Sequence, residues 1–377
     1  MAAERLMESN KSLPEERLAS LDVLRGFDMF WIVGGGSLLG AIINWLQWPI
    51  LEPLKKQLVH TDWVGFTAWD LIFPLFIFIS GVSIPFSFQK YLLSHEKSKL
   101  YLKIVKRAFI LIILGFIYNG LFKTFDFAHT RYLSVLGLIG FSYLWASIIV
   151  INFKPRNQAI FGILILIFYY ICMKYIPVPG FGAGVLTKEG NLASYIDRLI
   201  VPGKLIYEVS DPEGILMTFP ACVLAIAGAL TGVLLKNQNI KKYLKCVYIF
   251  SAGIIFVVLG LLFGTHFPII KKLWTSSFVV YTIGWSLLLT ALFYLIIDVW
   301  RIRKIFFPFM LIGLNPITIY FCAHKVINFQ QMSEFFFGGF ISMPGELLKP
   351  VILWLGILIC EFAFLYILYR KKIFLRV

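Results

Sequence analysis

Charged residues are scarce in this chain. Only 15% of the 377 residues are charged, whereas 59% are hydrophobic. A soluble domain carries about a quarter charged residues, so this chain lacks the polar surface that would cover a water-soluble fold. Apolar runs of about 20 residues recur instead, which is the length that crosses a bilayer as a helix. The composition therefore excludes a soluble domain and predicts an all-α integral membrane protein.

Cysteine and histidine are also few, with five residues of each. The cysteines stand singly in apolar runs without a CxxC pair, which excludes a disulfide framework and the usual zinc motifs. No two histidines share a metal-ligand spacing, so we expect no metal. An internal repeat is lacking as well, and the inverted-repeat transporters therefore receive no support.

Basic residues are the exception to this scarcity, because they give the chain a net charge of +15. They lie in short clusters between apolar runs and form no stripe with interleaved aromatic residues, so nucleic acid is not an expected partner. Such clusters are typical of cytoplasmic loops and of contacts with anionic lipid headgroups. Membrane lipid is therefore the expected partner of most of them.

Ten segments have the length and composition of a spanning helix. They lie at roughly 20–45, 66–89, 104–122, 132–152, 158–175, 215–235, 244–264, 275–297, 305–327 and 350–369. Roughly two thirds of the 35 Lys and Arg residues fall in the terminal segments and even-numbered loops, which places both termini in the cytoplasm. We therefore predict a bundle of about ten transmembrane helices. Residues 1–19 form a cytoplasmic N-terminal segment, residues 20–377 form one transmembrane domain, and the longest loop, 176–214, lies outside.

Polar residues at membrane depth are costly, and one group of them opens the second span. His60 and Asp62 lie at its outer mouth, and Asp70 begins the apolar run ten residues after His60. A histidine beside a carboxylate is held in one tautomer and becomes a better base. The alternative is structural, with His60 capping a helix and Asp70 pairing with a lysine.

Two further outer groups precede the sixth and the eighth spans. Asp211 and Glu213, in SDPEG, either begin a helix or offer carboxylates to a cationic amino sugar. Trp274 and Ser276 follow a pair of lysines in KKLWTSS. They either anchor a helix at the interface or bind a sugar ring.

Polar residues also interrupt the last two spans. Asn315 precedes Pro316 in the ninth span, and a proline at bilayer depth is tolerated where neighbours or a cavity satisfy the freed backbone groups. His324 follows at the outer end of the same span. Glu361 is the single charged residue in the apolar stretch of the last span, and its partner is not apparent from the sequence.

Three cations on the cytoplasmic side suit an anionic ligand. Arg25, Lys106 and Arg107 would hold phosphate groups, or would fix the orientation of the protein in the membrane. Arg25 is followed by Gly26, which leaves room for a ligand or for a close helix.

Five segments together carry a family resemblance. They are HTDWVGFTAWDLIFP at 60–74, SLDVLRGF at 20–27, DPEG at 211–214, LWTSSF at 273–278 and GLNPI at 313–317. The first contains the spacing His-x2-Trp-x-Gly-x-Thr-x2-Asp-Leu-x-Phe-Pro. In this combination the chain resembles the family of heparan-α-glucosaminide N-acetyltransferase and its bacterial relatives.

The resemblance implies a function and a set of site residues. It implies a multi-pass enzyme of a bacterial inner (cytoplasmic) membrane that moves acetyl from cytosolic acetyl-CoA to the amine of a glucosamine-type sugar or glycan outside. His60 and Asp70 would be catalytic. Substrate contacts would come from Asp62, Trp63, Asp211, Glu213, Trp274, Ser276, Asn315 and His324, and acetyl-CoA contacts from Arg25, Lys106, Arg107 and Asn315.

Two other functions remain open at this stage. A carrier for N-acetylglucosamine or a related amino sugar would need an outer carboxylate and aromatic cluster, but no phosphate-binding cations. An O-acetyltransferase for an envelope polysaccharide would keep the donor and change the acceptor. The sequence leaves open whether acetyl passes through the enzyme covalently, and it is compatible with a homodimer.

Overall fold

The described part of the structure is entirely helical. The computed structural model describes residues 18–94, 96–121, 126, 128–343 and 345–374, and no β-strand forms among them. Of the expected N-terminal segment 1–19, all but the last two residues lie outside this part. The prediction of an all-α membrane protein is confirmed.

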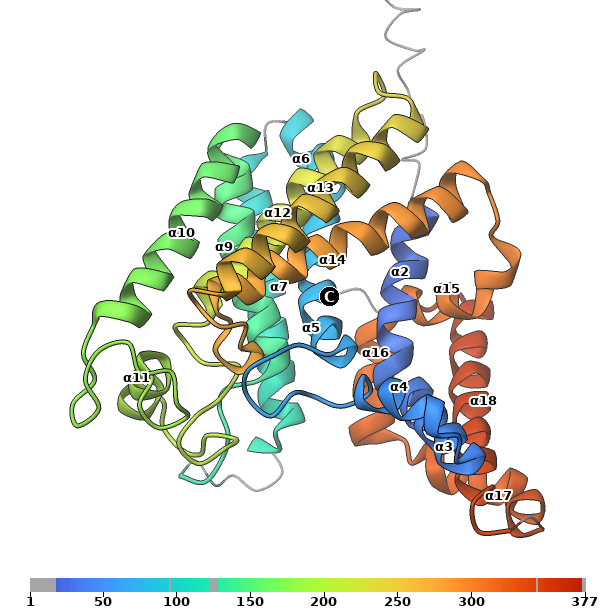
Figure 1. Cartoon of the computed structure of the whole chain (residues 1–377). Helices are drawn as coiled ribbons and strands as arrows, with labels where there is room; N and C mark the ends of the chain where they lie inside the picture. The colour runs from blue at the N-terminus through green and yellow to red at the C-terminus, as the bar shows by residue number, and fades with distance from the viewer. Residues whose placement is uncertain (1–17, 95, 122–125, 127, 344, 375–377) are drawn as a thin grey trace, which may run out of the picture.

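The helices follow one another along the chain with few long gaps (Figure 1). They are α2 (Ala19–Phe30), α3 (Gly36–Leu46), α4 (Glu52–Lys56), α5 (Ala68–Val82), α6 (Ile84–Leu93), α7 (Lys97–Tyr118), α9 (Val135–Asn152), α10 (Pro155–Tyr175), α11 (Leu192–Ile200), α12 (Thr218–Lys236), α13 (Lys242–Gly264), α14 (Ser276–Tyr294), α15 (Phe307–Leu314), α16 (Pro316–Phe321), α17 (Phe329–Ser342) and α18 (Lys349–Arg370). Shorter turns join some of them, including η1 (Trp31–Gly35), η3 (Lys271–Leu273) and η6 (Cys322–Val326).

Eight helical segments of the described chain are long and apolar enough to cross a membrane. The pair Lys304–Leu314 and Pro316–Val326, which is bent by 70°, makes a ninth if it is one span. The predicted span 104–122 coincides with most of α7, which is not among the eight and carries Lys103, Lys106 and Arg107. The prediction of ten spans is therefore not confirmed.

The segment 176–214, predicted to be a loop, contains the helix α11. Asn191 caps this helix by accepting a hydrogen bond from the backbone N–H of Ser194 at 2.8 Å. An oxygen at this position satisfies one of the four N–H groups that a helix start leaves unpaired.

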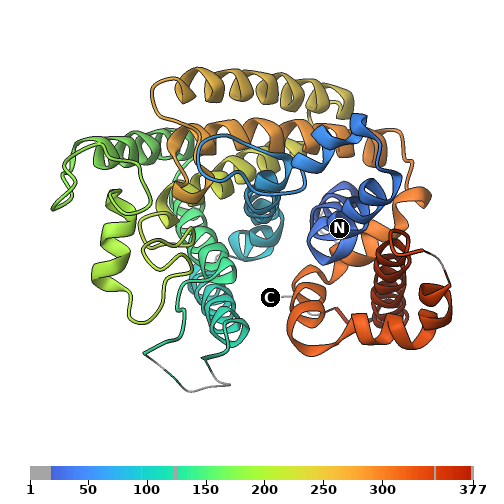
Figure 2. The ribbon, with the colours of Figure 1, turned by 60° about the horizontal axis from the view of Figure 1, so that its bottom comes forward.

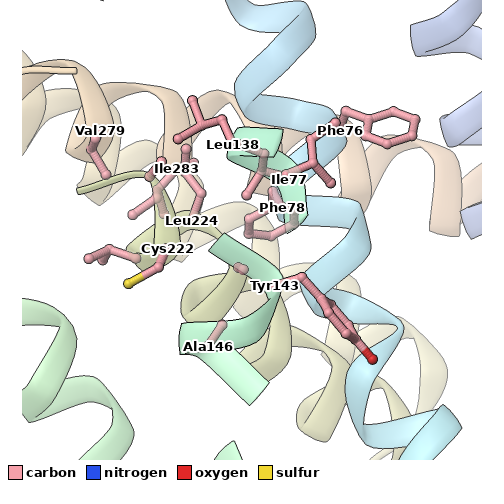
Figure 3. Close-up of a cluster of buried hydrophobic side chains, with 14 of the residues drawn as sticks. Phe76, Ile77, Phe78, Leu138, Tyr143, Ala146, Cys222, Leu224, Val279 and Ile283 are labelled. Atoms are coloured by element: carbon pink, nitrogen blue, oxygen red, sulfur yellow. The ribbon is translucent and has the colours of Figure 1, made fainter. Parts of the chain in front are cut away.

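The helix α12 lies at the centre of the bundle and packs against α5, α9, α10 and α14. Figure 3 shows side chains of these helices interlocking, among them Phe78 of α5, Tyr143 of α9 and Leu224 of α12. Lipid tails are as apolar as these side chains, so close approach and dispersion hold the helices together. A Cβ on Gly81 of α5 would lie 2.0 Å from a backbone oxygen of α12, so this crossing depends on glycine.

This packing brings the segments that precede α5, α12 and α14 together. The N–H of Gly65 donates to the carbonyl of Ile269 at 2.9 Å, and the indole N–H of Trp274 donates to the carbonyl of Pro212 at 2.9 Å. Figure 2 shows the loop before α5 lying beside the start of α14. The candidate site forms where these three segments meet.

Candidate functional site

A histidine and a buried aspartate form the centre of the site. The Nδ1 atom of His60, in the loop before α5, lies 2.8 Å from Oδ1 of Asp70. Asp70 is the third residue of α5, and its Oδ2 accepts the N–H of the capping residue Thr67 at 3.0 Å. The Asp70 side chain is fully buried, whereas that of His60 is 42% exposed. An ionised Asp70 can only accept, so Nδ1 of His60 donates and Nε2 is left as a proton acceptor.

Lys271 completes this group, although the sequence pattern indicates only an interface anchor there. Its Nζ atom lies 3.0 Å from both ring nitrogens of His60 and 3.8 Å from Oδ1 of Asp70. Burial lowers the pKa of Lys271, and the charges of Asp70 and Glu213 act in the opposite direction. A lysine with a lowered pKa gives up its proton more readily near neutral pH, so it can exchange protons with His60 or with a ligand.

The second group consists of Arg131, Asp211 and Glu213. The guanidinium of Arg131 donates twice to Asp211, from Nε at 2.7 Å and from Nη2 at 2.6 Å, and Nη2 also contacts Glu213. Arg131 lies between α7 and α9 in a stretch without a motif, so nothing in the sequence singles it out. This bidentate geometry holds the DPEG segment in place before α12.

The two carboxylates of the second group differ in their proton affinity. Burial raises the pKa of Glu213 to about 7, which the charge of Arg131 opposes and that of Asp211 reinforces. Burial also acts to raise the pKa of Asp211, but the hydrogen bonds from Arg131 hold this pKa below its ordinary value. The charge of Lys271 also acts on Glu213, so the two groups form one electrostatic unit.

Trp274 and Ser276 lie inside the packed core beside these groups. Trp274 is 1% exposed, and its ring meets Phe73 edge-on with the centroids 5.3 Å apart. The hydroxyl of Ser276 is fully buried and donates to the carbonyl of Leu166 at 2.7 Å. Their polar atoms are bonded to backbone carbonyls, so both residues act by positioning the DPEG segment and the start of α14.

Trp63 and Asp62 lie at the outer rim of the site. The indole N–H of Trp63 donates to the carbonyl of Leu186 at 2.7 Å, which ties the loop before α5 to the segment 176–214. Asp62 is exposed, and its backbone carbonyl accepts a hydrogen bond from Nζ of Lys272 at 2.8 Å. The carboxylate of Asp62 therefore faces the surroundings of the protein.

The other predicted substrate residues belong to the broken helix α15–α16. Asn315 is buried at the break, where its Nδ2 donates to the carbonyl of Ile373 at 3.1 Å. His324 is exposed in η6, with Nδ1 2.9 Å from the carbonyl of Tyr320. Asn315 therefore ties the break before Pro316 to the segment that follows α18, and His324 contacts the backbone just before η6.

The three predicted phosphate-binding cations lie on α2 and α7. Arg25 donates to Asp22 at 3.3 Å and to the hydroxyl of Ser83 at 3.0 Å. Lys106 is exposed, and the guanidinium of Arg107 lies 4.1 Å from the centre of the Tyr143 ring. Within the described residues, no group of three or more His, Cys, Asp or Glu side chains is placed to hold a metal ion.

The site as a whole can therefore carry out proton transfer on an amine-bearing ligand. It contains an imidazole oriented by a buried carboxylate, an adjacent amine with a lowered pKa, and a carboxyl group that titrates near neutral pH. Groups with these properties are typical of general acid–base and acyl-transfer chemistry.

Comparisons with known proteins agree with this chemistry. Residues 17–125 match a family model described as a domain of unknown function (DUF5009). The chain is 28% identical to heparan-alpha-glucosaminide N-acetyltransferase of Mus musculus, over 97% of this chain and 62% of that protein. It is 27% identical to the Homo sapiens protein of the same name, over 96% of this chain and 60% of that protein. The chain thus spans about three fifths of the length of these relatives, and the family resemblance indicated by the motifs is confirmed.

Proposed function

We propose that this protein is a transmembrane N-acetyltransferase that moves acetyl from acetyl-CoA to the amine of a glucosamine-type sugar. The observation that carries the proposal is the group in which Asp70 holds Nδ1 of His60 at 2.8 Å and Lys271 lies 3.0 Å from Nε2. The similarity to two proteins named as glucosaminide N-acetyltransferases supports the reaction class. In this proposal the donor is cytosolic, the acceptor is outside, and the membrane is a bacterial inner membrane.

The acceptor amine arrives protonated and is attracted by carboxylates. Glu213, whose pKa burial raises to about 7, is partly ionised at neutral pH, and its charge interacts with that of Lys271. The exposed carboxylate of Asp62 adds negative charge at the rim. Lys271 in its neutral form takes the proton of the incoming ammonium group, and the free amine then faces His60.

Acetyl transfer follows by nucleophilic attack on the thioester. The amine nitrogen attacks the carbonyl carbon, Nε2 of His60 takes the proton that the amine loses, and the C–S bond breaks to release the thiolate of coenzyme A, which takes the proton. Asp70 holds the proton on Nδ1, so Nε2 is the atom that takes up the proton of the amine and then gives it to the thiolate. In the covalent variant, Nε2 itself attacks the thioester carbon, and the C–S bond breaks to release the thiolate of coenzyme A. The amine then attacks the acetyl-imidazole, the bond from the acetyl carbon to Nε2 breaks, and the proton that the amine loses goes to the thiolate.

Binding of acetyl-CoA would use the cations of α2 and α7. Arg25 presents a guanidinium whose side chain is 21% exposed, and Lys106 is exposed on α7. Phosphate oxygens pair well with such groups. In the proposal the phosphates lie near these cations, at the cytoplasmic end, and the pantetheine arm passes Asn315 toward His60.

The test is acetyl transfer from radiolabelled acetyl-CoA to glucosamine by purified protein. We expect transfer by the wild type and a loss of at least a hundredfold in His60→Ala, because a positioned base contributes about 10²–10⁴-fold. His129→Ala is the matched control, since His129 is exposed and its Nδ1 pairs with Asp126 on the loop between α7 and α9. Absence of transfer by the wild type, together with protein-dependent uptake of N-acetylglucosamine into vesicles, would replace the enzyme with a carrier.

A further inference from the structure

A cavity lies beside α18, and its lining includes none of His60, Asp70 and Lys271. It has a volume of about 530 Å³ and lies between η1, η6, α18 and the start of α17. Its polar lining consists of Ser37, His324, Lys325, Asn328, Gln330 and Glu361. A cavity of this size is in the range of small-molecule binding sites, which run from about 300 to 1,000 Å³.

Glu361 is the buried carboxyl group in the lining of this cavity. It lies in the middle of α18, its residue is 3% exposed, and its Oε2 atom has no hydrogen-bond partner within the described residues. A carboxyl group at membrane depth without a partner is expensive, and such groups mark binding sites and ion pathways. Glu361 lines the cavity, so a ligand there would supply the missing partner.

The two basic side chains of the cavity, Lys325 and His324, make contacts with residues other than Glu361. Lys325 lies with Nζ 4.7 Å from the centre of the Tyr118 ring, in cation–π geometry. His324 has Nδ1 2.9 Å from the carbonyl of Tyr320, so Nδ1 donates and Nε2 remains an acceptor. A positive charge for Glu361 must therefore come from the ligand.

The remaining polar side chains of the cavity can form hydrogen bonds with hydroxyl groups of a ligand. Asn328 uses Oδ1 to accept the N–H of Gln331, and Gln330 uses Nε2 to donate to Glu334. The Nδ2 donor of Asn328 and the Oε1 acceptor of Gln330 are thereby left for other partners. Trp354 adds an aromatic wall, whose face attracts a cation and packs against the ring of a sugar.

A kink and a π-helical turn shape the walls of this cavity. Ile32 and Val33 come from η1, where the chain leaves the helical conformation at Gly34, and residues 323–326 come from the π-helical turn η6. A π-helical turn places one extra residue in a helix, and such turns are frequent at functional sites. Both interruptions of regular helix border the same polar space.

We propose that this cavity is an accessory binding site for a polyhydroxylated primary amine. Glu361 is the counter-ion of the ammonium group, and Asn328 and Gln330 bind the hydroxyls. The choice of an amino sugar as this ligand rests on the proposed function. The site is separate from His60, so it binds its ligand in the absence of acetyl-CoA and without any chemical step.

The test is protection of a thiol introduced at the cavity. Ser37 lines the cavity and is exposed, so the Ser37→Cys protein should react with a small maleimide. We expect glucosamine to slow this reaction severalfold, whereas N-acetylglucosamine and glucose, which lack the ammonium group, do not. Ser342→Cys on the exposed end of α17 is the matched control and should show no protection. The parent protein gives the background from its own five cysteines.

The charge requirement is tested by a second substitution. In Ser37→Cys/Glu361→Gln, the half-protecting concentration of glucosamine should rise at least tenfold, because the amide keeps the shape of Glu361 and removes its charge. Equal protection by glucosamine and N-acetylglucosamine, or protection that survives Glu361→Gln, would overturn the proposal. If Glu361→Gln does not fold, the comparison of the two sugars on Ser37→Cys alone decides.

The acetyl-transfer assay separates this inference from the proposed function. Transfer that depends on His60 without protection of Ser37→Cys overturns the accessory site and leaves the enzyme in place. Protection by glucosamine without any acetyl transfer keeps the accessory site and rejects the enzyme.

Discussion

Asp70 serves two neighbours with its two carboxylate oxygens. Oδ1 is 2.8 Å from Nδ1 of His60, while Oδ2 accepts hydrogen bonds from the backbone and the hydroxyl of Thr67. The sequence offers pairing with His60 and pairing with a lysine as alternatives for Asp70, but in the structure Asp70 lies beside both His60 and Lys271 and also caps α5. Because α5 fixes Oδ2, Oδ1 is held rigidly and orients the imidazole.

Two adjacent lysines give a sharp prediction at the scale of the residue. Lys271→Met should lower acetyl transfer at least tenfold and change its pH dependence, because the amine beside His60 and its lowered pKa are lost. Lys272→Met is the matched control, since Lys272 donates to the carbonyl of Asp62 and lies over the Tyr207 ring. The Lys272→Met substitution should change the rate of acetyl transfer by less than threefold. Equal losses in both variants would assign Lys271 a structural role.

The contact between His60 and Asp70 could be predicted from the sequence, and the contacts of Lys271 and Arg131 could not. His60 and Asp70 are ten residues apart in one motif, so a pattern connects them. Lys271 is 211 residues from His60, and Arg131 is 80 residues from Asp211, so only the packing of distant helices brings these partners together. A lysine pair before a span also has an ordinary explanation as a membrane anchor, which conceals its role.

Asp197 on α11 gives a prediction about stability and pH. Burial raises its pKa to about 7, while the N–H of Ile215 donates to Oδ1 at 2.9 Å and acts in the opposite direction. The folded protein keeps this proton where the unfolded chain has lost it, so the free energy of unfolding should fall as the pH rises from about 4 to 7 and level off above. A shift of this size corresponds to about 4 kcal/mol at most.

The measurement is thermal unfolding of the purified protein between pH 4 and 8. Asp197→Asn keeps the acceptor for Ile215 and cannot ionise, so it should lack this part of the decline and should exceed the wild type in stability at pH 8. The control is Glu189→Gln, an exposed position on the same outer segment. Parallel curves for Asp197→Asn and the wild type would show that Asp197 ionises normally in the folded protein.

At the scale of the element, the contact between α2 and α15 depends on two glycines. A Cβ on Gly26 would lie 1.7 Å from the carbonyl oxygen of Phe309, and a Cβ on Gly313 would lie 1.7 Å from that of Asp22. The room beside Arg25, which the sequence left to a ligand or a helix, is therefore occupied by α15. Of the two explanations that the sequence offers for Gly26, room for a ligand and room for a close helix, the close helix accounts for this glycine.

Gly26→Ala should therefore destabilise the protein by about 1–3 kcal/mol, the usual penalty for overpacking. Gly338→Ala on α17 is the matched control, because a Cβ at Gly338 meets nothing within 4 Å. It should leave the unfolding midpoint unchanged or raise it slightly, since alanine favours a helix more than glycine does. Thermal unfolding in the same detergent measures both, and an unchanged midpoint for Gly26→Ala would show that the two helices separate easily.

A helix could be predicted from the sequence where the thickness of the bilayer, rather than contact with other segments, sets its length. Long apolar runs such as those of α12 and α13 can be recognised in the sequence as spanning helices, because a helix needs about 20 residues to cross the membrane. The nine-residue α11 was not predictable in this way, because it depends on contacts with other segments, such as the bond between Asp197 and Ile215. Pro316 indicated a break in the ninth span, but not its angle of 70°.

At the scale of the whole molecule, the proposed reaction requires opposite ends of the bundle to face opposite compartments. The connection of α12 to α13 and that of α17 to α18 lie at opposite ends of the molecule in Figure 1. The distribution of basic residues predicts that the first faces the cytoplasm and the second the outside. Asn239 lies in the first connection and Glu346 in the second, and both are exposed.

Labelling of intact cells tests this orientation. A membrane-impermeant maleimide should react with Glu346→Cys in intact cells, and with Asn239→Cys only after the membrane is permeabilised. The parent protein supplies the background, because four of its five cysteines are buried. The reverse pattern would place the carboxylates of Asp62 and Glu213 on the cytoplasmic side. Donor and acceptor would then meet in one compartment, and the enzyme would have no need to carry acetyl across the membrane.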